Sequence, residues 1–293
     1  TRIKIDSSDN IFLLNPNSHS IIKLIYSNDS YTESVVAGGN GIGNELNQLS
    51  SPQGFDIDKD ANIYIADYQN HRVVKWAPGA SQGSIVAGGN GEGTALNQVS
   101  RPRAVAVNSL GDVYVSDSDY SNQLMKWESG ASEGVNVLYA YSLRDIKINS
   151  SDEIFLSFKY NHVVTKYSSS FQNLGNVFGN GSNGSSLNQL RYPEGIFVDK
   201  FGDVYVADTD NHRVLKVKLN PEIFIESGST TGVLSITGVE DRVDEEDETL
   251  IVTPGSSVSN VISSITDPTT ITLLDNSITL TQKDDPFNGL SKS

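Results

Sequence analysis

Two stretches decide the fold, NIYIADYQNHRVVKW at 62–76 and DVYVADTDNHRVLKV at 203–217, because they are copies of one unit. Three more diverged copies keep the same order of residue types: NIFLLNPNSHSIIKL at 10–24, DVYVSDSDYSNQLMKW at 112–127 and EIFLSFKYNHVVTKY at 153–167. Anchored on residues 11, 63, 113, 154 and 204, the copies lie 52, 50, 41 and 50 residues apart. A second element, GGNGxGxxLNQ, occurs at 38–48 and 88–98 and more loosely at 179–189. The 41-residue spacing, between residues 113 and 154, is the one that does not contain this element. The chain is therefore built on an internal repeat.

Each unit contains four short runs that alternate apolar and polar residues, the period of a strand with one buried face. In the second unit these runs are Gly54–Asp58, Ile63–Ala66, Arg72–Trp76 and Ser84–Ala87. Glycine, asparagine and aspartate clusters separate them and supply turn residues. Four antiparallel strands in every 40–50 residues predict the blades of an all-β propeller, since the alternative, a β-solenoid, normally has a shorter and more regular period.

At these motifs the chain resembles the bacterial NHL-repeat β-propellers, which are named for an Asn-His-Leu type motif. The motif stands here as Asn70-His71-Arg72-Val73 and Asn211-His212-Arg213-Val214, with Asn161-His162-Val163 as a third form. The resemblance covers residues 1–220 and implies a ring that typically has six blades. Five repeats are visible, the first starting inside its innermost strand and the fifth lacking its outermost strand. Upstream residues, another segment or another chain would complete such a ring.

An up-and-down meander places the loops between second and third strands on the same face as the blade-to-blade connections. We call this face, which collects the Asn-His loops and the GGNGxGxxLNQ insertions, the insertion face, and we expect it to bind the partner. The residues that open each innermost strand should ring the central channel there, and they vary from repeat to repeat. They are the predicted ligand-binding residues Gln53, Arg103, Arg144 and Glu194. Ordinary solvated channel lining is the alternative interpretation.

Motifs that suggest catalysis or metal binding have simpler explanations in the propeller part. All four histidines (19, 71, 162 and 212) fall in one register of the repeat, which favours a structural hydrogen bond in the turn over a metal site. Asp56, Asp58, Asp60 and Asn62 resemble the start of a calcium loop but lack its glycine and glutamate, which favours a turn. The string Gly-x-Ser-x-Gly occurs at 79–83 and 130–134, but it lies between the third and fourth strands of a unit and forms no strand-to-helix elbow, and His-Glu-x-x-His does not occur. We therefore expect no enzyme, the alternative being a propeller lyase or lactonase with a metal in the channel.

The last quarter of the chain differs in composition. Residues 1–220 hold 23 acids and 18 bases, whereas residues 221–293 hold 13 acids and 3 bases, which predicts a domain boundary near 220. The string GSTTGVLSITGVEDRVDEEDETLIVT, followed by TTITLLDN, resembles the C-terminal half of a Calx-β domain, a calcium-associated β-sandwich found in bacterial surface proteins. The resemblance implies a partial β-sandwich over 221–293 and possible calcium ligands at Glu240, Asp241, Glu245 and Asp275. A solvated charged hairpin is the alternative interpretation of these carboxylates.

Composition bounds the partners. The formal net charge of −15 argues against nucleic acid and anionic membrane surfaces, and no apolar run reaches the roughly 20 residues of a membrane span. Cysteine is absent, which excludes disulfides and thiolate chemistry. We expect a secreted or cell-surface prokaryotic protein that binds a protein or glycan through the insertion face. Its open β edges also predict self-association by strand exchange, and hence assembly into a surface fibre.

Overall fold

The structure, a computed structural model, describes residues 2–6, 8–27, 29–117, 122–219, 250–254 and 278–282. Within them the chain is all-β, apart from two single-turn 3₁₀ segments, η1 (Tyr68–Asn70) and η2 (Thr209–Asn211). No helix in this part of the chain is long and apolar enough to cross a membrane.

Five antiparallel sheets follow one another along residues 3–217, and each is one blade whose strands pair in chain order. Blade 1 contains β1 (Ile3–Ile5), β2 (Ile11–Asn15), β3 (Ser20–Ser27) and β4 (Ser30–Gly38). Blade 2 contains β5 (Gly54–Ile57), β6 (Ile63–Asp67), β7 (Arg72–Trp76) and β8 (Ser84–Gly88). Blade 3 contains β9 (Pro102–Val107), β10 (Val113–Asp117), β11 (Gln123–Trp127) and β12 (Val135–Tyr139). Blade 4 contains β13 (Leu143–Ile148), β14 (Ile154–Phe158), β15 (Val163–Tyr167) and β16 (Asn173–Phe178). Blade 5 has three strands, β17 (Pro193–Val198), β18 (Val204–Asp208) and β19 (Arg213–Val217).

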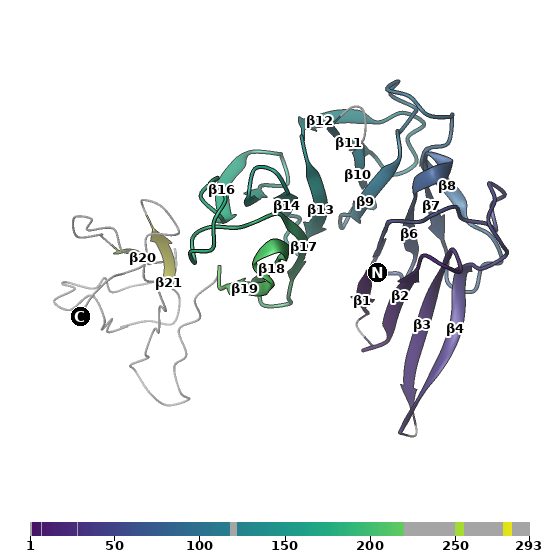
Figure 1. The fold of residues 1–293 in the computed structure, drawn as a ribbon, viewed down its shortest axis with the longest axis horizontal. Coiled ribbons are helices and arrows are strands. Elements are labelled where there is room, and N and C mark those ends of the chain that lie inside the picture. Colours follow the sequence, from purple (N-terminus) through teal and green to yellow (C-terminus); the bar gives the residue numbers. More distant parts are fainter. Residues whose placement is uncertain are drawn as a thin grey trace.

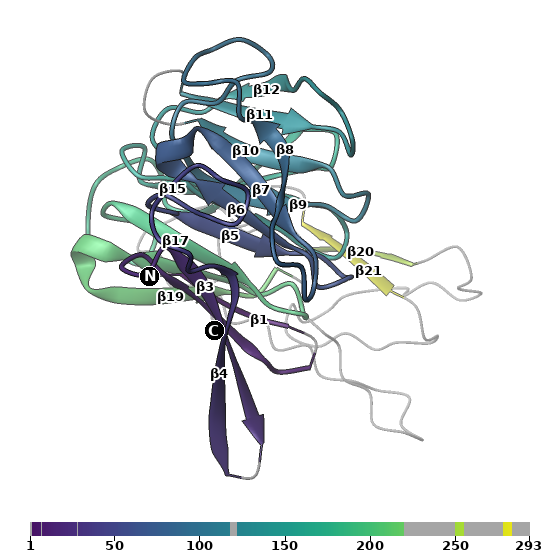
Figure 2. The same ribbon diagram turned by 90° about the vertical axis from the view of Figure 1, so that its right-hand side faces the viewer.

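The predicted all-β propeller with five repeats is confirmed, and the four runs predicted in the second unit coincide with β5–β8 to within one residue. Figure 1 shows the blades following one another around an arc, from blade 1 on the right to blade 5 on the left, with the innermost strands toward the centre. Neighbouring blades contact each other mainly through those strands, β5 against β9, β9 against β13 and β13 against β17. The same arc is seen from the side in Figure 2.

Both faces of a blade are apolar, because the preceding blade packs against one face and the following blade against the other. We call the face turned toward the next blade the forward face and the other the backward face. Phe12, Leu14 and Ile21 on the forward face of blade 1 share one core with Phe55, Ile65 and Trp76 on the backward face of blade 2. Tyr64, Ala66 and Val73 of blade 2 pack in the same way against blade 3, and the pattern continues to blade 5. The core therefore lies between the blades.

The Asp-x-x-Asn-His-Arg loop and the glycine-rich insertion form one hydrogen-bonded unit. The buried Asp67 carboxylate accepts from Arg72 Nε at 2.8 Å and from the Ser50 backbone N–H at 2.6 Å. Arg72 then donates to the carbonyl oxygens of Asn44, Glu45 and Gln48 in the insertion. Blade 5 repeats the arrangement with Asp208, Arg213 and the carbonyls of 185, 186 and 189. The motif thus holds the insertion that precedes each of these two blades.

The repeated histidines have the structural role predicted for them, but they bond to the next blade. Nδ1 of His19 accepts from the Ser51 N–H at 3.0 Å, and Nδ1 of His71 accepts from the Arg101 N–H at 3.3 Å. His162 and the N–H of Tyr192 form the third such bond, at 3.3 Å. All four histidines have a left-handed backbone (φ 50–57°), and in blades 1, 2 and 4 the histidine carbonyl oxygen leaves no room for a Cβ at the glycine where the outer strand ends, for example 2.7 Å away at Gly88. The repeated histidine and the glycine at the end of the outer strand are therefore both required where two blades join.

The two remaining described strands, β20 (Leu250–Pro254) and β21 (Ile278–Gln282), pair only with each other. They lie in the region predicted to be a partial Calx-β-like unit. The residues that carried that resemblance lie mostly outside the described residues, so the boundary at 220 and the β-sandwich stay predictions.

Arg72→Lys should lower the free energy of unfolding by about 3 kcal/mol, because an ammonium cannot replace four converging bonds and leaves buried acceptors unsatisfied. Arg213→Lys is the matched variant, since the Arg213 side chain is 24% exposed against 5% for Arg72 and water can replace part of its bonding. Urea unfolding of both variants measures the difference. An equal decrease in the free energy of unfolding in the two variants would contradict the idea that the burial of Arg72 makes its replacement more costly.

Candidate functional site

The four predicted ligand-binding residues lie at the same level of four consecutive blades, where each innermost strand begins. Gln53 directly precedes β5, and Arg103, Arg144 and Glu194 are each the second residue of β9, β13 and β17. Arg103 packs over the Tyr68 ring at 5.7 Å, and Glu194 forms an ion pair with Lys159 at 2.5 Å. These side chains belong to the insertion-face end of the channel. Ligand binding by these four residues stays a prediction.

Three tyrosines extend this end of the channel over the junction of blades 4 and 5. The Tyr141 and Tyr160 ring centroids lie 6.1 Å apart, and those of Tyr160 and Tyr192 lie 5.8 Å apart. Tyr192 also contacts the structural His162, and Lys159 lies over its ring at 5.9 Å. Tyr141 and Tyr160 are more than half exposed. We call Tyr141, Tyr160 and Tyr192 the tyrosine strip.

Arg144 adds a polar group beside the tyrosine strip. Its Nε is buried and has no hydrogen-bond acceptor among the described residues. Its own carbonyl oxygen accepts from Arg2, and the next residue, Asp145, is buried. A buried donor without an acceptor costs about 1–3 kcal/mol, and a bound carboxylate or carbonyl would remove that cost.

A charged cluster that the sequence analysis missed lies deeper in the channel. Arg2 forms an ion pair with Asp145 and donates to the Gln53 carbonyl oxygen at 3.1 Å, so it joins blades 2 and 4 across the channel. Lys147 lies 3.1 Å from Asp145, and Lys4 lies 2.6 Å from Asp56. The second carboxylate oxygens accept backbone N–H groups of the next blade, Val107 for Asp56 and Ile196 for Asp145. We call these five side chains the channel cluster.

The channel cluster shifts the pKa values of its buried members. Burial alone would raise the pKa of Asp145, but the charges of Arg2 and Lys147 and the Ile196 N–H outweigh it and lower the pKa to about 2. Burial, together with the charges of Lys4 and Arg2, lowers the pKa of Lys147 to about 8 against the attraction of Asp145. Both residues are therefore charged at neutral pH, and the cluster carries three positive and two negative charges.

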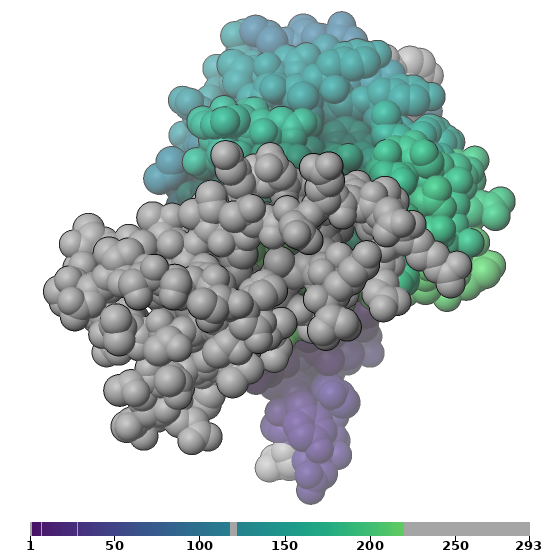
Figure 3. Space-filling model, turned by 90° about the vertical axis from the view of Figure 1, so that its left-hand side faces the viewer, coloured from purple at the N-terminus to yellow at the C-terminus, as the bar shows by residue number. Residues whose placement is uncertain are grey.

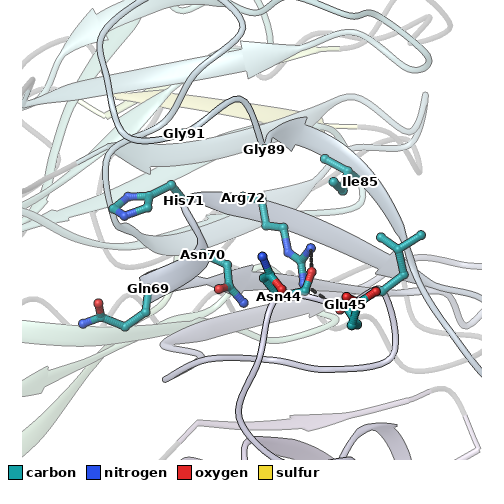
Figure 4. A pocket seen from close by; sticks show the side chains of 10 residues that line it. Asn44, Glu45, Gln69, Asn70, His71, Arg72, Ile85, Gly89 and Gly91 are labelled. Carbon is teal, nitrogen blue, oxygen red and sulfur yellow. Dashed lines mark hydrogen bonds between the residues drawn. The ribbon is translucent and has the colours of Figure 1, made fainter.

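A pocket of about 500 Å³ lies at the rim of blade 2, between the insertion and the Asn-His loop (Figure 4). Its lining includes Glu45, Asn70, His71, Arg72 and Ile85. Asn70 and Arg72 already donate to backbone carbonyls of the insertion, and His71 already accepts from Arg101. These polar groups hold the loop in place, so the channel end is the better candidate site.

The acidic turn behaves as predicted. Asp58 accepts the backbone N–H groups of Asp60 and Asn62 and the Tyr64 hydroxyl, so its oxygens are used within the turn. No group of three or more histidine or acidic side chains in the described part of the chain could hold a metal ion. The calcium candidates Glu240, Asp241, Glu245 and Asp275 lie outside the described residues, so calcium binding stays a prediction.

Comparison with known families agrees with the geometry. Residues 49–76 and 190–217 match the NHL repeat, and these segments run from just before β5 to the end of β7 and from just before β17 to the end of β19. The chain is therefore a five-bladed β-propeller that contains NHL repeats. No curated protein matches it in sequence.

Three solved structures share the architecture. A gluconolactonase from Xanthomonas campestris has 13% identity and a TM-score of 0.51, over 70% of this chain and 67% of the other. A protein of unknown function from Bacteroides thetaiotaomicron has 13% identity and a TM-score of 0.50, over 79% and 65%. Virginiamycin B lyase from Staphylococcus aureus has 11% identity and a TM-score of 0.47, over 74% and 68%.

These comparisons correct one expectation. The prediction of no enzyme is wrong as drawn, because an enzyme, a gluconolactonase, is among the similar solved structures. At 11–13% identity the likeness defines the fold alone. The lack of a His-Glu-x-x-His motif therefore does not exclude catalysis on this fold.

Asp145→Asn should lower the free energy of unfolding at pH 7 by about 2–4 kcal/mol, because it leaves Arg2 and Lys147 without their buried counter-charge. The lowered pKa of Asp145 adds stability that is fully present above pH 4 and is lost as the pH falls toward 2. The difference from the unchanged protein should therefore shrink over that range in chemical unfolding experiments. Asp60→Asn, in an exposed turn, is the control with no expected effect. A difference independent of pH would contradict the assigned ion pairs.

Proposed function

We propose that the protein binds another protein through the insertion face, at the channel end formed by blades 4 and 5. The single observation that carries the proposal is the exposed tyrosine strip beside Arg144 and the Lys159–Glu194 pair. Tyrosine and arginine are enriched among the residues that dominate the energetics of protein interfaces: tyrosine combines a large contact area with few rotatable bonds, and arginine adds a planar group that binds carboxylates. The strip rests on adjacent strand ends of two rigid blades, so little ordering is needed when a partner binds.

The chemistry of the site favours a partner that carries carboxylates. Arg103 and Arg144 open adjacent innermost strands, and the Arg144 Nε lacks an acceptor among the described residues. The channel cluster beneath them carries one positive charge more than negative charges. This basic end contrasts with a chain whose formal net charge is −15, so an acidic partner segment would be directed to it. Secretion or display on a prokaryotic cell surface is part of the proposal and follows from the sequence resemblances alone.

An array of random dodecapeptides, probed with the full chain, tests the proposal. Peptides rich in aspartate and glutamate should bind, and Tyr160→Ala or Arg144→Gln should each weaken that binding at least tenfold, about 1.4 kcal/mol. Phe201→Ser is the matched control, because Phe201 is an exposed aromatic residue in the β17–β18 turn on the opposite face. Binding of oligosaccharides alone on a parallel array would replace the protein partner by a glycan. Absence of any binding, or equal loss in the Phe201 variant, would overturn the site.

A second candidate function is assembly of copies of the chain into a fibre through open β edges. It is favoured by β19, because no described strand pairs with its outer edge. A free strand edge is a ready template for pairing with another chain.

A further inference from the structure

Blade 5 has a forward face that no described blade covers. Tyr205, Ala207 and Val214 occupy the repeat positions of Tyr64, Ala66 and Val73 in blade 2, which pack against blade 3. Val73 is completely buried, whereas Val214 is 69% exposed. Phe197 lies in the same row as Tyr205, their rings 5.9 Å apart, and it is also exposed. The forward face of blade 5 is therefore an exposed apolar wall, and we call the space between it and blade 1 the slot.

Blade 1 supplies the opposite wall. Ile3 and Ile5 occupy the positions of Phe55 and Ile57 in blade 2, where the backward face packs against the preceding blade. In blade 1 these isoleucines are 61% and 63% exposed. His212 lies at the same junction, and unlike the other three histidines it accepts no N–H from a following blade among the described residues. The slot is bounded by two faces that the repeat elsewhere buries.

The chain also has a projecting β-hairpin, formed by β3 and β4, with exposed apolar and aromatic side chains. β3 and β4 are eight and nine residues long, whereas the corresponding strands of blades 2–4 have five or six. The extra length forms a two-stranded hairpin that extends beyond the body of the molecule (Figures 2 and 3). It pairs Ile25 with Thr32 and Tyr26 with Tyr31, and all four side chains are exposed. We call residues 24–27 and 29–33 the arm.

The arm and the slot differ in charge in a complementary way. The arm carries Asp29 and Glu33, both exposed, and no base. The exposed Lys218 directly follows β19, the edge strand of blade 5, whereas Lys216 within β19 already forms an ion pair with Asp203 at 2.6 Å. Tyr26 and Tyr31 stack at 5.0 Å and present aromatic area to whatever the arm meets. A two-stranded ribbon with free edges can add to β19 and cover part of the open apolar face in one step.

We propose that the slot between blades 5 and 1 receives the arm of a second copy of this chain. The arm would extend the sheet of blade 5 beyond β19, with its apolar side chains against Val214, Phe197 and the Ile3–Ile5 wall. Because the arm and the slot are different surfaces of one chain, the contact is heterologous, and its repetition gives an open filament where the rotation between neighbours does not close a ring. The inference rests on the second candidate function above, and it specifies which segment of the neighbouring chain is donated.

Disulfide trapping tests the contact directly, because the chain has no cysteine to compete. Separately purified full-length Tyr31→Cys and Val214→Cys variants are mixed and oxidised. We expect a mixed dimer on a non-reducing gel, at a yield at least tenfold above that of Leu110→Cys mixed with Val214→Cys. Leu110 is a suitable control because it is the most exposed apolar side chain of a tight turn remote from arm and slot. Equal yields would overturn the proposal.

Light scattering over a concentration series separates this inference from assembly in general. The unchanged chain should grow in mass with concentration, and Tyr26→Ser/Tyr31→Ser should remain monomeric while Leu110→Ser should not. Glu33→Lys and Lys218→Glu should each weaken assembly, and the two together in one chain should restore it. An unchanged chain that stays monomeric throughout contradicts fibre assembly altogether. Assembly that persists in the double tyrosine variant overturns the arm as donor and leaves assembly by another edge.

Discussion

The structure depends on one constraint: a four-stranded blade has two apolar faces and can cover neither by itself. Every described core cluster lies between consecutive blades, and the aromatic residue at one fixed position, Phe12, Tyr64, Tyr114 or Phe155, meets the backward face of the next blade. The bond between His19 and the Ser51 N–H and the Asp67–Arg72 ion pair both act at the junction of blades 1 and 2. The repeat motif is therefore a description of how blades join.

This constraint also explains where variable chemistry can occur. Positions that pack between blades are restricted to apolar residues, whereas the ends of the innermost strands face the channel and are free to differ. Arg2 and Asp145 stand at a position filled by Gly54, Ala104 and Gly195 in the other blades. At Gly54 the small residue lets the next blade approach closely, because a Cβ there would lie 2.6 Å from the Arg103 carbonyl oxygen. The fixed and variable parts of the repeat thus lie within one strand.

The features that recur in every repeat could be predicted from the sequence, whereas contacts between residues of different repeats could not. Blade number, strand bounds and the level of Arg103, Arg144 and Glu194 followed from aligning the repeats. The next position of the same alignment would have shown that Arg2 and Asp145 are charged where the other repeats have a small residue. Tyr141, Tyr160 and Tyr192 come from three separate loops, and the packing of blade 5 on blade 4 brings the Tyr192 ring against that of Tyr160. No spacing along the chain indicates that contact.

The tyrosine strip bridges two blades, and this has a mechanical consequence. The arc is held by a series of blade junctions, so small rotations at the junctions add up and appear as a displacement of blade 5 relative to blade 1. A ligand bound across Tyr160 and Tyr192 would fix the rotation at the junction of blades 4 and 5. It would thereby change the separation of the two uncovered walls and couple the insertion face energetically to the opening of the arc. An incomplete ring can transmit such a change, whereas a closed one opposes it through its last junction.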